Sequence, residues 1–319
     1  MYKETKIRVK VKSIYKENQF VKRFTLVPVD RNTLPSFTGG AHITTYIDGK
    51  QRSYSLTSPP DQTNCYQLAI RLSEQSKGGS VYWHQHMKEG DELSISYPKN
   101  HFPLSFQAKH HVFYAAGIGI TPFLSMMSEI KGRGESFELH YTAKTRDLCA
   151  FYHFLNEEYP GQCRYYFTQE EGSERLKATT LLQHPIGTHV YFCGKESFIT
   201  KFSEAARNIG YPSSSIHVER FTPSLPLHHK PFQVKLSNGY IFEVGKDQTL
   251  LEALIGVGVK APYSCRVGRC GTCELKVVEG EIDHFDSFLD EEEKNGQKRI
   301  LTCVSRAKSN MLVLDIKQG

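Results

Sequence analysis

The stretch Cys265-Arg266-Val267-Gly268-Arg269-Cys270-Gly271-Thr272-Cys273 places three cysteines at the spacing C-x4-C-x2-C. A fourth cysteine, Cys303, follows after a further 29 residues. Two irons bridged by sulfides need four thiolates, and this spacing is the plant-type [2Fe–2S] pattern. Gly268 and Gly271 permit the tight backbone turns of such a loop, and their amides can donate hydrogen bonds to cluster sulfurs.

Structural zinc and buried free thiols are the alternatives for these cysteines. Zinc sites favour paired C-x2-C knuckles, and only one such pair is present, so the spacing favours [2Fe–2S]. Residues 232–316 resemble plant-type ferredoxins in this loop, in the lead-in 249–254 and in the stretch 261–265. The resemblance implies an α+β (β-grasp) ferredoxin domain at residues 232–319 whose cluster ligands are Cys265, Cys270, Cys273 and Cys303. Cys65, Cys149 and Cys163 lack the spacing, and we expect them to be packing or surface residues.

The 319 residues suffice for two or three domains of ordinary globular composition. No apolar run approaches the ~20 residues that span a bilayer, and residues 1–10 lack a signal-peptide core. We therefore expect a cytoplasmic protein with reduced thiols and no membrane partner. The net charge of +6 is too mild, and too mixed with acids, to indicate nucleic-acid binding.

Short strands separated by turn residues are predicted along residues 5–106. Gly39-Gly40, Asp48-Gly49 and Gly90-Asp91 punctuate them, which indicates an antiparallel β-barrel. The predicted strands are residues 6–11, 20–27, 42–47, 67–72 and 92–97.

Beyond this barrel, placed at residues 1–106, buried strands alternate with helices, which is typical of a parallel sheet with crossover helices. The predicted strands are residues 111–116, 138–141 and 189–193, and the predicted helices are residues 122–130, 148–158 and 197–208. We place this α/β domain at residues 107–221. Residues 222–231 contain three prolines and are predicted to be a stiff linker.

Two segments of the barrel suit a flavin. Arg52-Ser53-Tyr54-Ser55-Leu56 lies between a predicted strand and a Pro-Pro turn, and Gly78-Gly79-Ser80 precedes a predicted helix. Two glycines before a helix start expose backbone N–H groups that suit a phosphate. Each segment alone is weak evidence, but together they resemble the ferredoxin–NADP⁺ reductase family of flavin barrels.

That resemblance implies that Tyr54 packs against the isoalloxazine, that Ser55 faces its reactive edge as a catalytic residue, and that Arg52 meets the phosphate. The other flavin-binding residues that it implies are Leu56, Ala69, Arg71, Gly78, Gly79 and Ser80. The order of barrel, nucleotide domain and ferredoxin most resembles the phthalate dioxygenase reductase and vanillate demethylase reductase family, as does the barrel exit at residues 98–104. Those members carry FMN, so FMN is expected rather than FAD.

Ala116-Gly117-Ile118-Gly119-Ile120-Thr121-Pro122 follows the first strand of the α/β domain. Glycines at such a turn let a pyrophosphate approach the helix N-terminus, and proline fits a first helical turn. A bare G-x-G is weak evidence, but the segment resembles the G-x-G-x-T-P of the same reductases. Phe192-Cys193-Gly194-Lys195 stands where those reductases show Cys-Gly-Pro, so Lys195 departs from the pattern.

The nicotinamide-dinucleotide residues that the resemblance implies are Gly117, Gly119, Thr121, Pro122, Arg146, Cys193 and Gly194. Cys193 is implied to be a catalytic residue near the nicotinamide, with a buried core thiol as the alternative. Both signs of charge surround Arg146, so the residues leave NADH and NADPH open, while the resemblance favours NADH. Phe221 resembles the aromatic that lies on the flavin face in these reductases, and the alternative is ordinary core.

These expectations combine into one function. NADH gives two electrons as hydride and a [2Fe–2S] cluster accepts one at a time, so a flavin must bridge them. We predict a monomeric NAD(P)H-dependent oxidoreductase that passes electrons from NADH to FMN, to [2Fe–2S], and on to a Rieske-type oxygenase, as the resemblance implies. The alternatives are a cytochrome P450 partner and a redox-sensing module. No general acid or base is required, so the fourteen histidines need no catalytic role, and only His228-His229 form a ligand-like pair.

Six acids fall within eleven residues of the ferredoxin region: Asp283, Asp286, Asp290, Glu291, Glu292 and Glu293. Acids complement the dipole at a helix start, which is one role for them. The alternatives are a negative face that steers a basic partner, or docking against the basic first part of the same chain.

Overall fold

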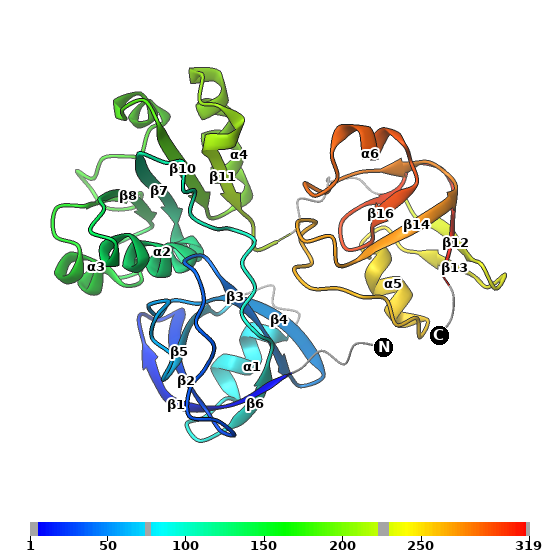
Figure 1. Cartoon of the computed structure of the whole chain (residues 1–319), viewed down its shortest axis with the longest axis horizontal. Helices are drawn as coiled ribbons and strands as arrows, with labels where there is room; N and C mark the ends of the chain where they lie inside the picture. Colours follow the sequence, from blue (N-terminus) through cyan, green and yellow to red (C-terminus); the bar gives the residue numbers. More distant parts are fainter. Residues whose placement is uncertain (1–5, 74–77, 223–229, 317–319) are drawn as a thin grey trace. The chain divides into compact units, whose positions relative to one another are not determined.

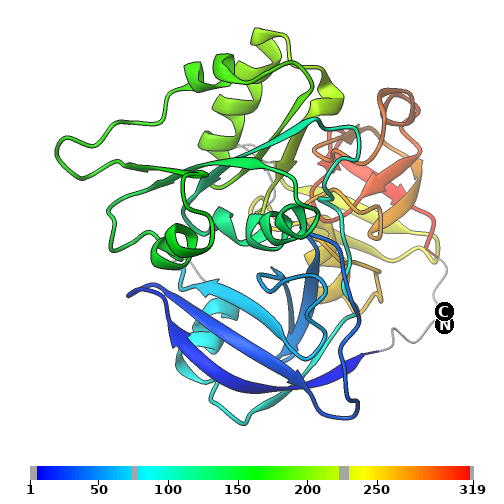
Figure 2. The same ribbon diagram turned by 60° about the vertical axis from the view of Figure 1, so that its left-hand side comes forward.

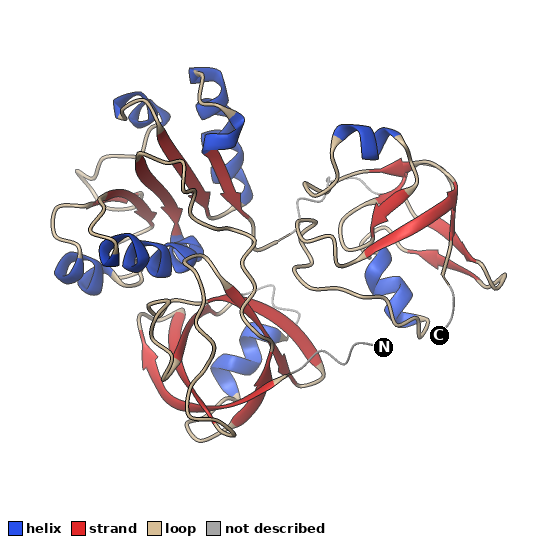
Figure 3. Ribbon diagram, in the orientation of Figure 1, coloured by secondary structure: helices blue, strands red, loops and turns tan. Residues whose placement is uncertain are grey.

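The structure, a computed structural model, describes residues 6–73, 78–222 and 230–316. Its contacts separate two compact units, Met1–Glu219 and Arg220–Gly319. Within the described residues, the first unit contains a six-stranded and a five-stranded sheet, and the second contains a five-stranded sheet, a two-stranded sheet and short helices (Figures 1 and 3). Of the predicted linker, residues 223–229 lie outside the described residues. In the described part of the chain, no helix is both long enough and apolar enough to cross a bilayer.

The first sheet of unit 1 is antiparallel and nearly closed, as predicted. Its strands are β1 (Ile7–Lys16), β2 (Val21–Pro28), β3 (His42–Ile47), β4 (Lys50–Ser55), β5 (Tyr66–Arg71) and β6 (Glu92–Ile95), in the order β4-β3-β6-β1-β2-β5. An isolated bridge between Leu56 and Leu68 joins the two edges, so the sheet forms a near-barrel. Ile7, Val9 and Val11 are buried and alternate with exposed residues, because one face of β1 lines the core.

Helix α1 (Gly79–Gln85) fills the near-barrel with the side chain of Trp83, whose ring meets that of Phe24 edge-on at 4.7 Å. The segment containing Arg52 is itself strand β4, which the sequence analysis did not predict as a strand. Asp48 and Gly49, with φ of 46° and 66°, form the hairpin turn that pairs β4 with β3. The sequence analysis placed this segment after a strand, whereas the hairpin turn makes it a strand of the near-barrel.

The second sheet of unit 1 is parallel, with the order β11-β10-β7-β8-β9. Its strands are β7 (His110–Ala116), β8 (Phe137–Ala143), β9 (Cys163–Phe167), β10 (Thr188–Cys193) and β11 (Ile216–Glu219). The connections contain helices α2 (Thr121–Gly132), α3 (Tyr152–Glu158) and α4 (Glu196–Ile209) and 3-10 turns η1 (Gly117–Ile120), η2 (Ala178–Gln183) and η3 (Ser213–Ser215). Val112 and Tyr114 pack with α4, whereas Phe113 and Ala115 pack with α2 and α3, so helices cover both faces (Figure 2).

Three details of this sheet differ from the prediction. Strands β9 and β11 are edge strands, whose partly exposed residues lack the continuous apolar run of the central strands. The predicted helix at residues 148–158 begins only at Tyr152. Phe151 has φ of 63°, in the left-handed region, and the preceding residues form turns instead of a helix.

The two sheets of unit 1 share one apolar core. Val21 and Ala69 of the near-barrel, together with Phe102, pack in the same cluster as Phe123 of α2. The backbone N–H of Gly40 also donates to Ser125 Oγ of α2 at 3.1 Å. This packing brings β5 of the near-barrel into contact with η1. The predicted boundary between residues 106 and 107 falls in the connection from β6 to β7.

Unit 2 is an α+β fold with the sheet order β13-β12-β18-β14-β16. Its elements are β12 (Phe232–Leu236), β13 (Ile241–Val244), α5 (Leu250–Gly256), β14 (Glu274–Glu279), β15 (Ile282–Asp283), α6 (Glu291–Asn295), β16 (Arg299–Leu301), β17 (Arg306–Ala307) and β18 (Met311–Leu314). Thr249 and Glu252 form a reciprocal capping box at the start of α5, whose apolar residues pack into the core of this sheet. The cysteine loop 265–273 therefore lies between two folded elements of the chain, α5 before it and β14 after it.

Candidate functional site

The cysteine loop of unit 2 follows a path that its glycines make possible. Gly268 and Gly271 have φ of 73° and 71°. A Cβ on Gly268 would lie 2.6 Å from Val304 Cγ2, and one on Gly271 would lie 2.4 Å from the ring of Phe288. Both positions therefore combine a left-handed backbone with close neighbours, which excludes a side chain.

The loop brings the four predicted ligands together as two contacting pairs of free thiols. A hydrogen bond from Cys265 lowers the pKa of Cys270 to about 4, and one from Cys303 lowers the pKa of Cys273. One thiol of each pair is thus favoured as thiolate, the form that binds iron.

Backbone N–H groups of the loop point at these sulfurs. Val267 and Arg269 donate to Cys265, the former at 3.5 Å, and Gly268 donates to Cys303. Such donors stabilise the negative charge of cluster sulfurs. The donor set fits a [2Fe–2S] cluster.

Asp286 supports the loop, a role that the sequence analysis did not assign. Its buried carboxylate accepts hydrogen bonds from Ser305 Oγ at 3.1 Å and from the Leu289 backbone at 2.9 Å. Next to it, Ser287 N donates to the Gly268 carbonyl at 3.0 Å. The segment that follows β15 is thereby tied to the cysteine loop.

In unit 1, two cations lie beside the glycine turn that begins α1. Gly78 has φ of 97°, and a Cβ there would lie 3.2 Å from Lys50 Cε. A Cβ on Gly79 would lie 2.9 Å from Arg52 Cγ and 3.1 Å from Arg52 Nε. Backbone N–H groups at a helix start with two adjacent cations suit a phosphate. Lys50 was missed by the sequence analysis, although it lies two residues before Arg52 and hence on the same side of the strand.

The other predicted flavin residues occupy two strands of the near-barrel. Tyr54 lies edge-on to Trp83 at 6.0 Å, while Ser55 and Leu56 are buried. On β5, Ala69 is buried and Arg71 is exposed. Ser80 Oγ accepts a hydrogen bond from Ser73 N at 3.1 Å, which secures the turn before α1. β4 and α1 are in contact, so the two predicted flavin segments meet.

Replacing Arg52 with Gln is expected to weaken flavin binding about 10- to 100-fold, because a charge-assisted hydrogen bond to phosphate contributes roughly 1.5–3 kcal/mol. Glutamine retains most of the packing against Gly79. The measurement is flavin fluorescence during titration of deflavinated protein at two salt concentrations. Arg31→Gln is the matched control, because Arg31 is an exposed arginine of the same unit that contacts Tyr97. Equal affinities for the two variants would contradict the assignment.

The predicted dinucleotide turn meets the end of β10 at the carboxyl edge of the parallel sheet. A Cβ on Gly119 would lie 2.3 Å from the Cys193 carbonyl oxygen, and one on Gly194 would lie 2.6 Å from Ala116 Cβ. The two turns can therefore approach each other this closely only because both positions are glycine. Tyr141 OH donates to the Gly117 carbonyl at 2.9 Å and holds the first turn in place. Ligands of open α/β sheets bind at this edge.

The remaining predicted nucleotide residues lie along the same turns. Thr121 and Pro122 are buried in the first turn of α2, where Thr121 Oγ1 donates to the Ile118 carbonyl at 3.0 Å. Cys193 is fully buried at the end of β10. Lys195 begins α4 with φ of −70° and ψ of 151°, values that proline also adopts, so its departure from Cys-Gly-Pro preserves the backbone path.

Arg146 follows β8 at the same edge and lies beside two neighbouring aromatic rings, those of Tyr152 and Phe167. Its guanidinium carbon is 5.4 Å from the centre of the Tyr152 ring and 5.7 Å from that of Phe167. Its backbone N–H donates to Glu170, which adds a carboxylate that the sequence analysis did not assign. Phe221 follows β11 in the second unit, with 43% of its surface exposed, and its role at the flavin stays a prediction.

A cavity of about 850 Å³ in unit 1 lies apart from these residues. Its lining includes Thr57 and Gln67 from the near-barrel, Leu124 of α2 and Phe154 of α3, and none of the predicted site residues.

Comparisons with known proteins cover the whole chain. Residues 234–308 match the model of the 2Fe-2S iron-sulfur cluster binding domain, and residues 97–216 match that of the dimethylamine monooxygenase subunit DmmA-like, N-terminal domain. The carnitine monooxygenase reductase subunit of Escherichia coli is 39% identical over 97% of this chain and 98% of its own. The heme-dependent oxidative N-demethylase beta subunit of Ectopseudomonas mendocina is 39% identical over 89% and 91%. The solved structure of phthalate dioxygenase reductase aligns with a TM-score of 0.79 and 32% identity over 98% of each chain.

The near-barrel, the parallel sheet and the cysteine loop define an NAD(P)H-dependent oxidoreductase that uses a flavin and a [2Fe–2S] cluster. Its relatives are reductase components of oxygenase and demethylase systems. The chain belongs to the family of phthalate dioxygenase reductase and vanillate O-demethylase oxidoreductase. The predicted family, fold class and electron-transfer function are confirmed.

Proposed function

We propose that this chain is the NADH-dependent, FMN-containing reductase of a Rieske-type non-haem iron oxygenase, and that it acts as a cytoplasmic monomer. The observation that carries the proposal is the convergence of the cysteine loop and Cys303, whose four free thiols receive backbone hydrogen bonds in the same chain as the flavin and nucleotide folds. When bound, the flavin supplies the conversion of one hydride into two single electrons. The described cysteines of both units are free thiols, which supports a location in a reducing compartment such as the cytoplasm.

The residues of unit 1 divide the work of holding the two cofactors. Arg52, Lys50 and the N–H groups before α1 bind the flavin phosphate, while Tyr54 and Ser55 line the ring. Gly117, Gly119 and Gly194 admit the dinucleotide to the carboxyl edge of the parallel sheet. The contact between β5 and η1 places the proposed flavin and nicotinamide sites on adjoining elements, as direct hydride transfer requires.

The choice of NADH rests on Glu170. A carboxylate at the carboxyl edge suits the ribose 2′-OH and repels a 2′-phosphate. The guanidinium of Arg146, the cation that could bind that phosphate, packs beside the rings of Tyr152 and Phe167. We expect kcat/KM to be higher for NADH than for NADPH. Mass spectrometry of the flavin released by heat distinguishes FMN from FAD.

A haem-containing oxygenase is the second candidate partner. The observation that favours it is the 39% identity to the beta subunit of a heme-dependent oxidative N-demethylase. The two partners differ in their spectra on reduction. The deciding experiment combines this reductase and NADH with the oxygenases encoded beside it and identifies the product. Rapid reduction of a haem partner, with none of a Rieske protein, would overturn the Rieske proposal.

The acidic segment of unit 2 has mixed roles. Asp290 and Glu293 form the capping box of α6, Asp286 is buried, and Glu293 pairs with Arg299. Glu291 and Glu292 remain exposed, with 86% of the Glu291 side chain accessible although it pairs with Lys294. Of this segment, we therefore assign the partner face to these two glutamates.

The double variant Glu291→Gln, Glu292→Gln is expected to slow oxygenase reduction about 3- to 10-fold at low salt, because charges at an interface rim mainly accelerate encounter. Ferricyanide reduction should be unchanged, and the difference should vanish at high salt. Stopped-flow absorbance measures both rates. Glu293→Ala serves as the structural control and should lower stability by about 1 kcal/mol, because it removes the side chain that accepts from the Asp290 N–H in the capping box. A changed flavin-to-cluster rate in the double variant would instead indicate docking within the chain.

A further inference from the structure

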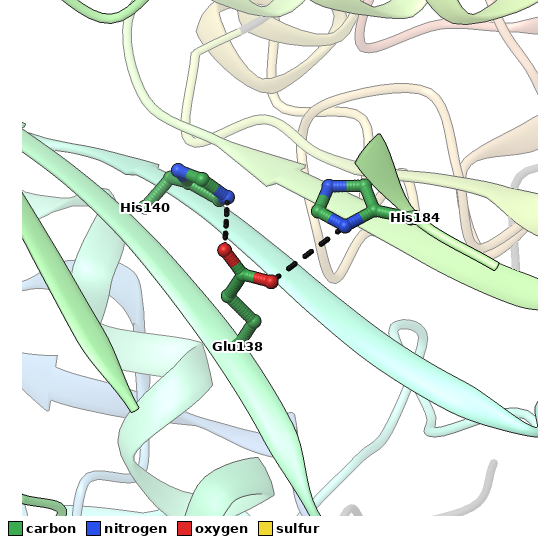
Figure 4. A group of neighbouring side chains, drawn as sticks. All are labelled: Glu138, His140 and His184. Carbon is green, nitrogen blue, oxygen red and sulfur yellow. Dashed lines mark ion pairs between the residues drawn. The ribbon is translucent and has the colours of Figure 1, made fainter. Parts of the chain in front are cut away.

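Three side chains that the sequence analysis left without a role converge near the start of β8. Glu138 and His140 lie two residues apart on this strand, and His184 follows η2 (Figure 4). His140 Nε2 is 3.0 Å from Glu138 Oε1, and His184 Nδ1 is 3.6 Å from Glu138 Oε2. One ligand atom from each residue lies within 4.8 Å of the others. The three groups thus face a common point.

The outer nitrogens of both histidines are held by tyrosines. His140 Nδ1 is 2.8 Å from Tyr166 OH, and His184 Nε2 is 2.8 Å from Tyr114 OH. Oxygen partners on the far side of the ring are the usual support of a metal-binding histidine, because they fix its tautomer and orientation.

The hydrogen bonds around His184 select a tautomer. Thr180 Oγ1 donates to the Lys177 carbonyl at 2.9 Å, so in its 3.1 Å contact with Tyr114 the threonine accepts. Tyr114 has then used its proton, and its oxygen accepts from His184 Nε2–H. His184 Nδ1 consequently carries a lone pair directed at Glu138.

Two polar atoms of this group are buried without a hydrogen-bond partner in the described part of the chain. His140 itself is fully buried. Neither His140 Nε2 nor Glu138 Oε1 has a hydrogen-bond partner among the described residues. Their 3.0 Å approach is therefore a close contact that lacks the alignment of a hydrogen bond.

We propose that Glu138, His140 and His184 bind one divalent ion of the zinc class, with water completing the coordination. Two imidazoles and a carboxylate are ligands that zinc accepts at ~2.0–2.2 Å, which in a tetrahedron places the ligand atoms ~3.3 Å apart. Glu138 presents one oxygen to each histidine, at 3.0 and 3.6 Å, and one ligand atom of each residue lies within 4.8 Å of the others, so the three residues can approach this spacing. Arg164 Nε lies 3.3 Å from Glu138 Oε1, but this side chain is 58% exposed and can turn into solvent as the ion binds.

The location indicates a structural ion. Glu138 is the second residue of β8, and His184 precedes β10, so the site lies at the amino edge of the sheet. The predicted dinucleotide turn after β7 and Cys193 at the end of β10 lie at the opposite edge. The ion would attach the end of η2 to the central strands without taking part in hydride transfer.

The test is zinc uptake by the full-length holoprotein, measured by equilibrium dialysis and elemental mass spectrometry after treatment with a weak chelator. Wild-type protein should bind one zinc per chain, with iron content unchanged, and zinc should raise its unfolding temperature. Glu138→Gln and, separately, His184→Gln should each weaken uptake at least ~10-fold. Glu135→Gln is the matched control and should bind zinc like the wild type, because Glu135 lies 4.0 Å from buried His111 without a third ligand.

NADH–ferricyanide activity should be the same in all these proteins. The proposal is wrong if wild-type protein takes up no zinc at low micromolar concentrations, or if Glu138→Gln and His184→Gln bind it as tightly as the wild type. Zinc uptake that accompanies loss of iron would place the ion on the cluster cysteines and would also overturn the proposal.

Discussion

Replacing Cys270 with serine is expected to remove the iron–sulfur absorbance and to lower oxygenase reduction by at least ~100-fold, while flavin stays bound. Cys270 belongs to the loop that supplies three of the four thiolates, and a cluster with a missing thiolate is not retained. Arg52 and Tyr54, which we propose bind the flavin, are in the other unit. Absorbance spectra, iron content and NADH-dependent reduction of ferricyanide and of the oxygenase measure the separate effects.

Cys65→Ser is the control for this change. Cys65 is a buried cysteine outside the loop, and its sulfur accepts a hydrogen bond from Gln62 Nε2 at 2.9 Å that a serine oxygen can also accept. This variant should retain the cluster and both activities. The cluster assignment would fail if Cys265, Cys270, Cys273 and Cys303 all reacted freely with a thiol reagent in the purified native protein.

A chain that ends at Thr222 is expected to fold, to retain flavin and to oxidise NADH with ferricyanide at a rate within about twofold of the full chain. Residues 1–219 form a compact unit in which the near-barrel and the parallel sheet share a core, so the contacts for flavin and dinucleotide are all retained. Oxygenase reduction should be lost, because the cysteine loop is absent. Flavin content and steady-state rates measure the two effects.

The complementary fragment, residues 230–319, is the control and should assemble the cluster without flavin. Its own apolar core and the capping box of α5 support independent folding. Loss of flavin from the first fragment would contradict the division of the cofactors. Retained oxygenase reduction by that fragment would show that electrons leave without the cluster.

The sequence predicted most where the evidence is local. The C-x4-C-x2-C loop, its two glycines and the turns at Gly78 and Gly117 concern neighbouring residues, whose spacing limits the backbone directly. The change from period-two strands to alternating strands and helices similarly predicted an antiparallel sheet followed by a parallel one. Elements with weaker patterns were not predicted. They are the edge strands β9 and β11 and the strand β4, whose polar residues resemble those of a loop.

Folding brings to the proposed flavin and cluster sites some residues that no local sequence pattern identifies. Lys50 joins Arg52 only because the hairpin at Asp48-Gly49 brings β4 beside the start of α1. Asp286 appeared in the sequence as one of six clustered acids, yet it is buried and supports the cysteine loop. Whether a carboxylate is exposed or buried depends on the residues that surround it in the folded chain, and these come from distant segments.

By itself, the sequence predicted the order of the folds and the four cluster cysteines, because these depend on periodicity and spacing, and its resemblance to a known family predicted the class of protein. Only the tertiary structure decided which polar side chains meet. His184 lies 46 residues from Glu138, and crossover connections bring it beside β8. Long-range pairing of this kind depends on how strands order themselves in a sheet, and one-dimensional spacing carries little record of that order.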